Sequence, residues 1–465
     1  MKYQGLRDWL KKVEQMDEMA HISGVDWNLE VGAIYQLASN RDNGPAVLLD
    51  DIKDYPSGHR ILLNALGSIK RMALTLDFPT DLTPTQFIRA WKDYQKKIQY
   101  NIPPEVVKSG PVFENVVEEN QINLYQLPAP WWHEHDGGRY LGVGSVTITR
   151  DPDQGWVNLA TYRVMIHDEK TLSCYIAPGK HGRMHRDKAL SAGQSFKIAI
   201  SFGHDPLVFF AGGMDCPPGV SEYDFMGAIK KHPYEVVEGG FSGLPIPADS
   251  EIAIEGEILP GEQMKEGPFG EWTGYYASGS REEPIIRVKR LMYRNNPILM
   301  GRSHKMALRA GMIWDHLEKA GVPDVKGVWF HPAGGNKMIL IVSIKQRYPG
   351  HAKQAALIAS QCRPGAYLGR YVIVVDEDID PSNTNEVLWA VATRSDPEVS
   401  IDIIRRCWSG PLDPIFPADR KGHNSRAIIE ACKPFEWIDK FPVSCQTGKE
   451  LSDRVIAKWG KLLGI

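Results

Sequence analysis

Residues 265–275 read KEGPFGEWTGY, and the rest of the chain is organised around this stretch. Two carboxylates, Glu266 and Glu271, lie five positions apart and are separated by Gly-Pro-Phe-Gly. Proline fixes its own φ, and glycine permits conformations closed to other residues, so we expect a tight turn. A turn would carry both glutamates towards one cleft, where environment can separate the pKa values of paired carboxylates for acid/base work. The alternative is a surface loop with two solvated glutamates, since turns of this composition are common.

Length and composition describe a globular protein with several domains. A chain of 465 residues exceeds one ordinary core, so two or three domains are expected. The hydrophobic and charged fractions, 43% and 24%, are typical of soluble domains. The formal net charge of -3 gives no support for binding to nucleic acid or to an anionic membrane.

The cysteines and the N-terminal residues favour a cytoplasmic location. Six scattered cysteines form no CxxC pair, which suits a reducing compartment better than a disulfide framework. The first residues, MKYQGL, lack the apolar core of a signal peptide, and no apolar run of about 18 residues occurs. We therefore expect a soluble protein without a membrane segment.

The first 110 residues are expected to form an α/β lobe. Apolar side chains with helical spacing predict a helix within residues 5–20, and residues 45–50 read as a short buried strand. Thr83 followed by Pro84 predicts the N-cap and first position of a helix that runs to about Tyr100.

The middle of the chain reads as a β-rich domain. An alternating segment at residues 143–149, the turn sequence DPDQG and a return strand at residues 156–166 predict a hairpin. Ser221 is expected to cap a helix. Further strands are expected at residues 172–177, 207–211, 251–259 and 284–293. Short strands with few long helices favour a barrel or a sandwich.

The pattern changes after about residue 300, where apolar strands alternate with helices. This alternation is typical of βαβ units and predicts a smaller open sheet. The strands are expected at residues 328–330, 338–342 and 371–375, and the helices near residues 352–361 and 385–393.

Residues 158–163, NLATYR, place polar side chains on the return strand of the hairpin. A spacing of five puts Asn158 and Arg163 on opposite faces of a regular strand. If both serve one site, a bulge or bend must interrupt the strand, and bulges are frequent beside active sites. An edge strand with solvated polar residues is the alternative.

The densest basic patch is KHGRMHRDK at residues 180–188. It follows a predicted strand and contains glycine, so its backbone and side-chain donors together suit a phosphate. His181 and His185 have the i, i+4 spacing of zinc ligands on a helix, but no HExxH motif supports zinc. A solvated start of a basic helix is the alternative.

Three acidic or histidine-rich segments favour structural roles when taken alone. Residues 133–136, HEHD, have the composition of a metal cluster, yet the flanking tryptophans and glycines favour a packed corner. Glu222 follows the expected cap Ser221, where an acid complements the helix dipole. Residues 376–380, DEDID, lack a Gly-rich phosphate loop, so capping and dipole roles are favoured over a magnesium site.

Taken together, these segments resemble the UbiD family of reversible decarboxylases, which use prenylated FMN. The segments that carry the resemblance are NLATYR at residues 158–163, His181, GVSE at 219–222, PADSEI at 247–252, EGPFGE at 266–271, VVDEDID at 374–380, WA at 389–390 and RSDP at 394–397. They follow the family's order over most of the chain. The resemblance implies an α+β fold: a flavin-reductase-like split β-barrel core with an N-terminal α/β lobe, a linker helix and a C-terminal α/β domain.

The resemblance also implies a domain division and an assembly. We expect an N-terminal lobe at residues 1–110, a split barrel that binds prenylated FMN at 111–300, a linker helix region at 301–325, and a C-terminal oligomerisation domain with a C-terminal helix at 326–465. Relatives form dimers or hexamers, so a homo-oligomer of either kind is expected. A flavin prenyltransferase is the expected supplier of the cofactor.

By position, Asn158, His181 and Glu222 correspond to the family's ligands for a divalent ion, usually manganese, that holds the flavin phosphate. Glu238 is the alternative to Glu222. Oxygen and imidazole donors suit Mn²⁺, and the resemblance implies K⁺ near the phosphate as well. The cofactor contacts that it implies are Asn158, Thr161, Tyr162, Arg163, Lys180, His181, Glu222 and Arg370.

The family's catalytic Glu-Arg-Glu trio corresponds to Glu266, Arg163 and Glu271. Loss of CO₂ leaves two electrons on carbon that no side chain accepts, so a cofactor must be the electron sink. Arg163 would bind the carboxylate, Glu266 would orient Arg163, and Glu271 would deliver the proton that replaces CO₂. Trp272 beside the acid favours a flat aromatic or heteroaromatic substrate.

Two other functions are open at this stage. A split-barrel oxidoreductase with ordinary FMN would consume NAD(P)H, but no dinucleotide fingerprint supports it. A non-catalytic subunit of a multi-component carboxylase is the other, and the presence of all three trio residues argues against it. The identity of the acid, the physiological direction and the type of covalent adduct stay open.

Overall fold

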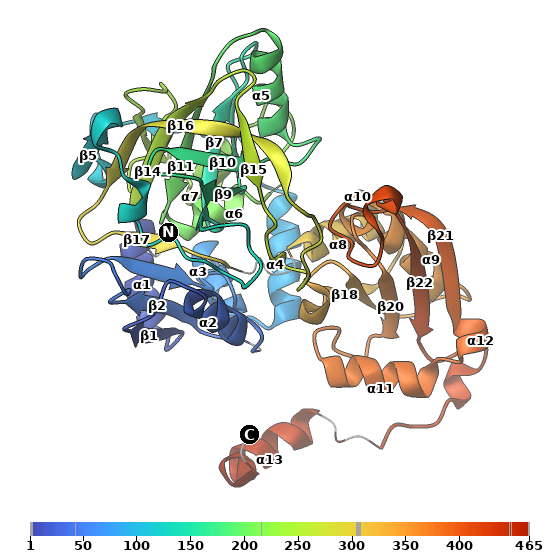
Figure 1. Ribbon diagram of the computed structural model, residues 1–465. Coiled ribbons are helices and arrows are strands. Elements are labelled where there is room, and N and C mark those ends of the chain that lie inside the picture. Colours follow the sequence, from blue (N-terminus) through green and yellow to red (C-terminus); the bar gives the residue numbers. More distant parts are fainter. Residues whose placement is uncertain are drawn as a thin grey trace.

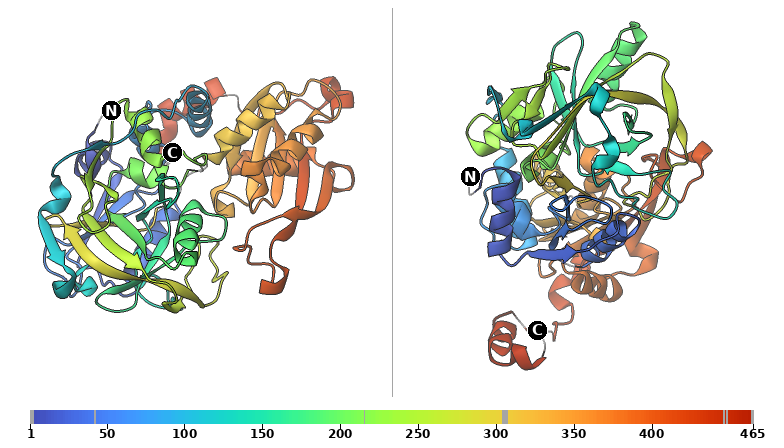
Figure 2. Two further views of the ribbon diagram at one scale, coloured as in Figure 1. Left: turned by 90° about the horizontal axis from the view of Figure 1, so that it is seen from above. Right: turned by 60° about the vertical axis from the view of Figure 1, so that its left-hand side comes forward.

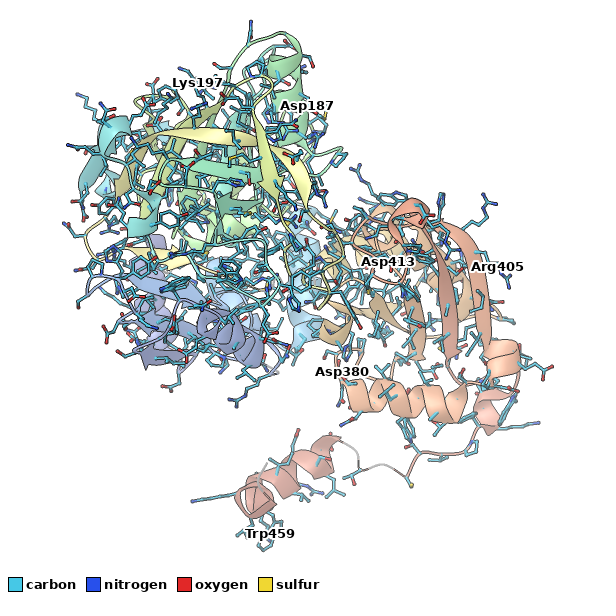
Figure 3. All side chains as sticks on the ribbon, in the orientation of Figure 1. Asp187, Lys197, Asp380, Arg405, Asp413 and Trp459 are labelled. Atoms are coloured by element: carbon cyan, nitrogen blue, oxygen red, sulfur yellow. The ribbon has the colours of Figure 1, made fainter. Side chains whose placement is uncertain are left out.

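The computed structural model describes residues 3–41, 43–214, 216–303, 308–445, 447 and 449–463. They form a larger N-terminal body and a smaller C-terminal domain that begins with helix α8 (Arg309–Lys319) (Figure 1). The last helix, α13 (Lys449–Leu463), lies apart from that domain, and its Trp459 ring is exposed (Figure 3). Among these residues no helix combines the length and the apolar character needed to span a membrane.

The N-terminal lobe is a four-stranded sheet with helices packed against it. Its elements are α1 (Gly5–Gln15), β1 (Met19–Ser23), α2 (Glu30–Ser39), β2 (Ala46–Asp50), β3 (Arg60–Leu63), α3 (Ile69–Thr75) and α4 (Pro84–Gln95). The sheet order is β1-β2-β3-β17, and β17 (Ile298–Met300) pairs parallel to β3 although it comes much later in the chain. The apolar stripe of α1 and strand β2 are buried, so both predictions are confirmed.

Helix α4 begins where the sequence predicts. Thr83 Oγ1 accepts from Gln86 N at 3.3 Å, and Gln86 Oε1 accepts from Thr83 N at 3.0 Å, which makes a capping box before Pro84. The helix ends at Gln95, about one turn before the predicted end near Tyr100. Its buried face stops at Trp91 and the residue after it, so packing gives no reason to extend it.

The middle of the chain forms a ten-stranded antiparallel sheet that curls into a half-barrel (Figures 1 and 2). Its main path is β6-β9-β10-β16-β14-β11-β7-β8, with β5 and β15 both paired to β16. The strands are β5 (Asn115–Glu118), β6 (Tyr140–Gly142), β7 (Val146–Arg150), β8 (Val157–Ala160), β9 (Arg163–Ile166), β10 (Thr171–Tyr175), β11 (Phe196–Phe202), β14 (Ile252–Ile258), β15 (Gln263–Glu266) and β16 (Arg281–Tyr293). Aliphatic side chains of β11, β14 and β16 are buried, so the sheet encloses one of the hydrophobic cores.

The predicted hairpin is confirmed, and its return strand is interrupted. Strand β7 pairs with β8, and Asn158 lies opposite Thr149. The strand stops at residues 161–162 and resumes as β9, which pairs with β10 and β6 instead of β7. This is the break that a single site containing both Asn158 and Arg163 would require.

The strand predicted at residues 207–211 is wrong. The segment is helix α6 (Pro206–Ala211), in which Asp205 Oδ1 accepts from Leu207 N at 2.8 Å and proline occupies the first position. Every residue of α6 is buried, so its sequence is uniformly apolar and carries no period that separates a helix from a strand. The Asp-Pro pair was the available signal for a helix start.

Two further helices contact strand β8: α5 (His181–Ser191) and α7 (Glu222–Lys230). Ser221 Oγ accepts from Tyr223 N at 3.3 Å, so the predicted cap of α7 is confirmed. A small sheet of order β13-β12-β4 lies beside the half-barrel and contains β4 (Glu105–Val106), β12 (Glu235–Glu238) and β13 (Pro245–Pro247).

The C-terminal domain contains a five-stranded mixed sheet of order β18-β19-β20-β22-β21. Its strands and helices are β18 (Val325–Phe330), β19 (Ile339–Ile344), α9 (His351–Gln361), α10 (Arg363–Ala366), β20 (Tyr371–Asp376), α11 (Thr384–Arg394), α12 (Pro397–Ser400), β21 (Ile401–Trp408) and β22 (His423–Ala431). Every strand and helix predicted after residue 300 is present. Short 3₁₀ turns lie at Pro111–Phe113, Glu119–Gln121, Leu124–Gln126, Pro332–Gly334, Ala418–Arg420 and Phe435–Lys440.

Candidate active site

Arg163 binds both glutamates of the stretch at residues 265–275. Its Nε and Nη2 donate to the two carboxylate oxygens of Glu266, each at 2.8 Å, and its Nη1 donates to Glu271 Oε1 at 2.6 Å. Arg163 begins β9, Glu266 ends β15, and Glu271 lies in the following loop. A planar guanidinium matches a carboxylate in two-point contact, so Glu266 fixes the orientation of the fork. We call these three residues the arginine trio.

The arginine trio is buried in the barrel. The side chains of Arg163, Glu266 and Glu271 are 8%, 1% and 11% exposed. The alternative of a loop with two solvated glutamates is therefore wrong. Burial opposes the charge on Arg163, but its hydrogen bonds and charge attraction to Glu266, together with the charge of Glu271, outweigh burial and raise its pKa.

The loop between the two glutamates is irregular, and the tight turn lies beyond it. Residues 267–270 have no regular secondary structure and return the chain to Arg163. Gly267 has a φ of +80°, which glycine adopts without steric cost. A turn then follows, in which Gly274 N donates to Glu271 O at 3.0 Å and Glu271 N donates to Tyr275 O at 3.1 Å. The tight turn predicted at Gly-Pro-Phe-Gly is therefore wrong, although this irregular loop does bring both glutamates to Arg163.

Tyr140 supports Glu266 and was missed in the sequence. Its hydroxyl donates to Glu266 Oε1 at 2.9 Å from strand β6. Burial raises the pKa of Tyr140, and the neighbouring carboxylate raises it further, so the hydroxyl remains a proton donor to Glu266. Only the pairing of β6 with β9 brings Tyr140 to this place, and no local pattern predicts that pairing.

A second group of polar residues surrounds strand β8, and two of them, Asn158 and Glu222, are buried. Asn158 lies on β8, and Glu222, the first residue of α7, accepts from Leu159 N at 2.7 Å. His181 begins α5, and its ring lies 4.7 Å from the Trp156 ring, measured between centroids. The residues predicted as metal ligands thus lie on, or begin, elements that meet at β8. We call Asn158, His181 and Glu222 the β8 cluster.

Two polar atoms in or beside the β8 cluster are buried without a hydrogen bond of normal geometry to the described residues. Asn158 is 2% exposed, and its Nδ2 makes no hydrogen bond of normal geometry with the described residues; the same holds for the buried Tyr162 hydroxyl. Burial raises the pKa of Glu222 to about 8, although the Leu159 amide opposes the shift. Glu238, the alternative ligand, is exposed at the end of β12 in another sheet, so the geometry favours Glu222.

The other predicted cofactor contacts divide between the two parts of the molecule. Thr161 and Tyr162 occupy the break between β8 and β9, and Lys180 is the N-cap residue of α5. Arg370 lies immediately before β20 in the C-terminal domain, where it binds Asp413. The first three residues therefore adjoin the β8 cluster, whereas Arg370 belongs to another domain.

The C-terminal domain contacts the loop that carries Glu271. The Trp272 ring packs so closely on Gly335 that a Cβ added there would lie 2.2 Å from it. The Lys337 ammonium lies 4.5 Å from the centroid of the indole, and Lys421 donates to a backbone carbonyl of the same loop. The residue after Glu271 is therefore held between the two domains.

Other candidates from the sequence are structural. The described residues contain no group of three His, Cys, Asp or Glu side chains arranged to hold a metal, so the HEHD segment and the HxxxH pair gain no support as zinc sites. His185 Nδ1 lies 3.1 Å from the Thr149 hydroxyl, and burial lowers its pKa to about 4. Asp376 and Asp378 bind Arg394 at 2.9 and 2.8 Å, so these acids form ion pairs instead of capping a helix.

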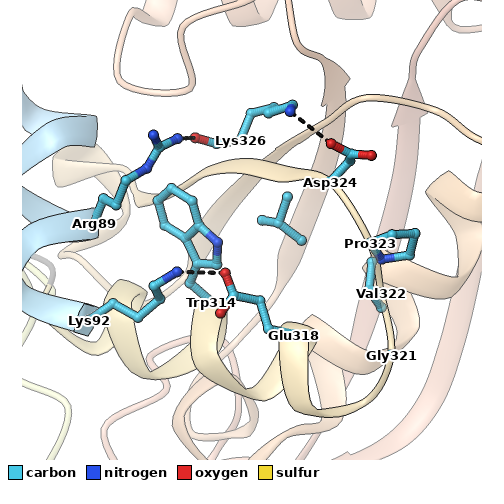
Figure 4. Close-up of a pocket in the computed structure, with 10 residues that line it drawn as sticks. Arg89, Lys92, Trp314, Glu318, Gly321, Val322, Pro323, Asp324 and Lys326 are labelled. Carbon is cyan, nitrogen blue, oxygen red and sulfur yellow. Dashed lines mark hydrogen bonds and ion pairs between the residues drawn. The ribbon is translucent and has the colours of Figure 1, made fainter. Parts of the chain in front are cut away.

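A cavity of about 560 Å³ lies at the junction of α4, α8 and β18 (Figure 4). Arg89 and Lys92 lie over the Trp314 ring at 5.2 and 4.7 Å from its centroid. The two lining acids, Glu318 and Asp324, pair with lysines. None of the residues that line this cavity belongs to the arginine trio or the β8 cluster, so it is not the candidate active site.

Models of three domains of one family match the chain. The N-terminal, Rift-related and C-terminal domains of 3-octaprenyl-4-hydroxybenzoate carboxy-lyase, UbiD, match residues 10–91, 105–304 and 305–431. Together these matches cover most of the sequence.

Individual relatives are similar to this chain over nearly its whole length. The phenolic acid decarboxylase of Bacillus subtilis (strain 168) is 34% identical over 462 residues, which covers 93% of each chain. The UbiD-class enzyme HmfF from Pelotomaculum thermopropionicum, solved in complex with FMN, superposes with a TM-score of 0.86 at 27% identity and covers 97% of this chain and 100% of its own. An evolved dimeric form of HmfF in complex with prFMN gives a TM-score of 0.82 at 26% identity, with 96% and 98% covered. From its three matched domains and its relatives, this chain belongs to the UbiD family of carboxy-lyases.

Proposed function

We propose that this protein is a non-oxidative decarboxylase of an aromatic or heteroaromatic carboxylic acid that works with prenylated FMN. One observation carries the proposal: a buried guanidinium bonded to two carboxylates, with all three contacts at 2.8 Å or less. The names of its relatives, a phenolic acid decarboxylase and UbiD-class enzymes in complex with FMN and prFMN, support the substrate class and the flavin.

Arg163 is the proposed carboxylate-binding residue. Glu266 occupies Nε and Nη2 of its fork, and Glu271 occupies only Nη1. A substrate carboxylate that approaches Nη1 competes with Glu271 for this donor. Substrate binding would therefore release Glu271 from its ion pair while Glu266 keeps the arginine in place.

Glu271 is the proposed proton donor. A largely buried carboxylate that loses its arginine partner takes up a proton from solvent more readily than an ion-paired one. It can then deliver the proton that takes the position of CO₂ on carbon. In the reverse direction the same side chain removes that proton, so the site is expected to catalyse carboxylation as well.

Prenylated FMN, when bound, supplies the sink for the electron pair that remains on carbon as CO₂ departs. We infer that Asn158, His181 and Glu222 hold a divalent ion, Mn²⁺ by donor type, against the flavin phosphate. Asn158 Nδ2 and the Tyr162 hydroxyl are buried donors that suit phosphate oxygens, and a cation beside Glu222 would offset the cost of its buried charge.

Residues that adjoin the β8 cluster are proposed as further contacts to the cofactor. Thr161, Tyr162 and Lys180 are the proposed additional contacts, with K⁺ near the phosphate. Arg370 is left out because it lies in the C-terminal domain and binds Asp413. Trp272 is the proposed aromatic wall of the substrate pocket, since it directly follows Glu271 in the loop.

Assembly and cellular context complete the proposal. We expect a homo-oligomer, because a related structure is described as dimeric. A flavin prenyltransferase is the expected source of the cofactor. All six cysteines are free, which supports a cytoplasmic location.

The test is to co-express the chain with a flavin prenyltransferase and to screen phenolic, furan and pyrrole acids for CO₂ release. The expected result is turnover of at least one acid by the purified chain alone, without NAD(P)H. Consumption of NAD(P)H with ordinary FMN would instead indicate an oxidoreductase. Absence of turnover until another subunit is added would indicate a subunit of a larger carboxylase.

A further inference from the structure

Two side chains of opposite charge bind the peptide groups of Gly270, the residue before Glu271. Gly270 N donates to Asp136 Oδ1 at 2.8 Å, and Arg302 Nη2 donates to Gly270 O at 2.5 Å. Both contacts involve a charged partner, and such hydrogen bonds are about twice as strong as neutral ones. The backbone is therefore held on both sides directly before the proposed acid.

His133 joins these two side chains. Arg302 Nη1 lies 2.8 Å from His133 Nε2, and His133 Nδ1 lies 3.2 Å from Asp136 Oδ2. A guanidinium can only donate, so Nε2 must accept and the ring proton must be on Nδ1, where it donates to Asp136. Asp136, His133 and Arg302 thus form one chain of hydrogen bonds around Gly270, which we call the loop clamp.

The loop clamp leaves little room for movement at Gly270. A Cβ added to Gly270 would lie 2.6 Å from His133 Nδ1, closer than side chains approach in folded proteins. One residue earlier along the loop, the buried Phe269 ring lies 4.9 Å from Arg302 Cζ and 5.4 Å from Arg163 Cζ. The chain before Glu271 is therefore fixed by hydrogen bonds, by steric contact and by cation–π packing.

From these contacts we propose that Asp136, His133 and Arg302 are positioning residues that hold Glu271 in place for proton transfer. The inference rests on the proposed function of Glu271. Among the described residues, the side chain of Glu271 is hydrogen-bonded to Arg163, and a substrate carboxylate would take over this donor. Once substrate is bound, Glu271 is held through its backbone: the turn to Gly274 and Tyr275 follows it, and the loop clamp fixes the residue before it. A displacement of about 1 Å can cost roughly 10²-fold in rate, so this restraint matters for catalysis.

The inference is tested with variants of the clamp in the flavin-loaded enzyme. Asp136→Asn would place amide hydrogens against the donors of His133 or Gly270. Arg302→Met would remove the hydrogen bonds that Arg302 donates to His133 and Gly270 but would keep an apolar side chain of similar length. For each we expect kcat to fall about 10- to 100-fold while KM changes by less than about threefold and bound flavin is unchanged. We also expect a larger solvent isotope effect on kcat, because proton transfer becomes rate-limiting.

Two further variants separate positioning from general damage. Glu134→Gln, an exposed acid-to-amide change two residues from Asp136, should leave kcat and the isotope effect unchanged. Arg302→Lys keeps a cation with a single donor nitrogen, so it should recover part of the kcat that Arg302→Met loses. It also gives a second measurement if Arg302→Met does not fold.

The outcomes distinguish the clamp from the function on which it rests. Wild-type kcat and isotope effect in Asp136→Asn and Arg302→Met, with an inactive Glu271→Gln, would overturn the clamp and leave the proposed function standing. Full turnover by Glu271→Gln would instead remove the proton donor. A lower kcat without any change in the isotope effect would count against positioning and favour a purely structural role.

Discussion

The arginine trio and the β8 cluster lie in the same barrel but differ in how their charges are satisfied. Arg163 has a carboxylate at each side of its fork, and Glu266 also accepts from Tyr140. In the β8 cluster, Asn158 Nδ2 makes no hydrogen bond of normal geometry with the described residues, and burial raises the pKa of Glu222 to about 8. The two groups are linked through strands β8 and β9, which are consecutive in the sequence and are separated by the irregular residues 161–162.

The difference shows which part of the site the protein completes by itself. Buried charges are tolerated when they are paired and hydrogen-bonded, and the arginine trio meets that condition without a ligand. A buried donor without a partner costs about 1–3 kcal/mol, which the oxygens of a bound phosphate would remove. The trio is therefore preorganised, and the incomplete hydrogen bonding of the β8 cluster supports our proposal that a cofactor binds there.

Replacement of Arg163, the cation that both glutamates bind, should have the largest effect on stability and activity. Arg163→Met leaves Glu266 buried without its partner, so we expect a loss of about 3–5 kcal/mol in the free energy of unfolding and no measurable turnover. Denaturant unfolding and CO₂ release measure the two effects. Arg287→Met is the matched control, because Arg287 binds Glu262 at 2.7 and 2.6 Å at the surface, where a pair contributes about 1 kcal/mol or less. Equal losses of unfolding free energy in both variants would contradict the inference that the buried trio stabilises the protein more than a surface ion pair does.

Replacement of the proposed acid should remove catalysis without unfolding the site. Glu271→Gln keeps an oxygen that accepts from Arg163, so we expect retained flavin and stability but at least about 10²-fold lower kcat. The loss should appear equally in CO₂ release and in exchange of the product proton with deuterated buffer. The exposed acid in Glu282→Gln serves as the control and should behave as wild type.

The β8 cluster should respond to metal and to pH. Glu222→Gln should weaken Mn²⁺-dependent flavin binding at least about tenfold, whereas Glu238→Gln, an exposed control, should not. The folded pKa of Glu222 is about 8, above its usual 4.5, so metal-free wild type should lose stability as pH rises from about 4.5 to 8. That part of the pH dependence should be absent in Glu222→Gln and suppressed by Mn²⁺. Identical melting curves for both proteins across this range would refute the assignment.

The smallest expected effect comes from Tyr140. Tyr140→Phe removes one hydrogen bond to Glu266 but leaves the two-point bond from Arg163. We expect about 1–3 kcal/mol lower stability and less than about tenfold lower kcat. A loss of activity as large as that of Glu271→Gln would mean that Tyr140 takes part in proton transfer itself.

The sequence predicts those parts of the site that local patterns encode. The composition of residues 265–275 suggested that Glu266 and Glu271 share a cleft. The spacing of Asn158 and Arg163 predicted a break in the strand if both serve one site, and the structure contains that break. Helix starts were readable at Thr83 and Ser221, because capping residues act locally. The pairing of Arg163 with both acids followed from the resemblance and not from spacing.

The parts that the sequence does not reveal depend on distant segments. Tyr140 reaches Glu266 from a strand 126 positions away, and Arg302 reaches Gly270 from 32 positions beyond it. The HEHD segment was recognised as a packed corner, but nothing local indicates that Asp136 binds the loop before Glu271. Helix α6 was misread because a fully buried segment shows no amphipathic period.

Strand β17 has a consequence for how the polypeptide acquires its structure during synthesis. Ile298, Leu299 and Met300 are fully buried and pair with Arg60, Ile61 and Leu62 of β3. While the ribosome is still translating the barrel, the edge of β3 lacks this neighbour, and an unpaired apolar edge is prone to association with other chains. The nascent N-terminal lobe should therefore depend on chaperones until residue 300 has left the ribosome. A fragment that ends after α4 should aggregate, even though it contains all the helices and the first three strands of the lobe.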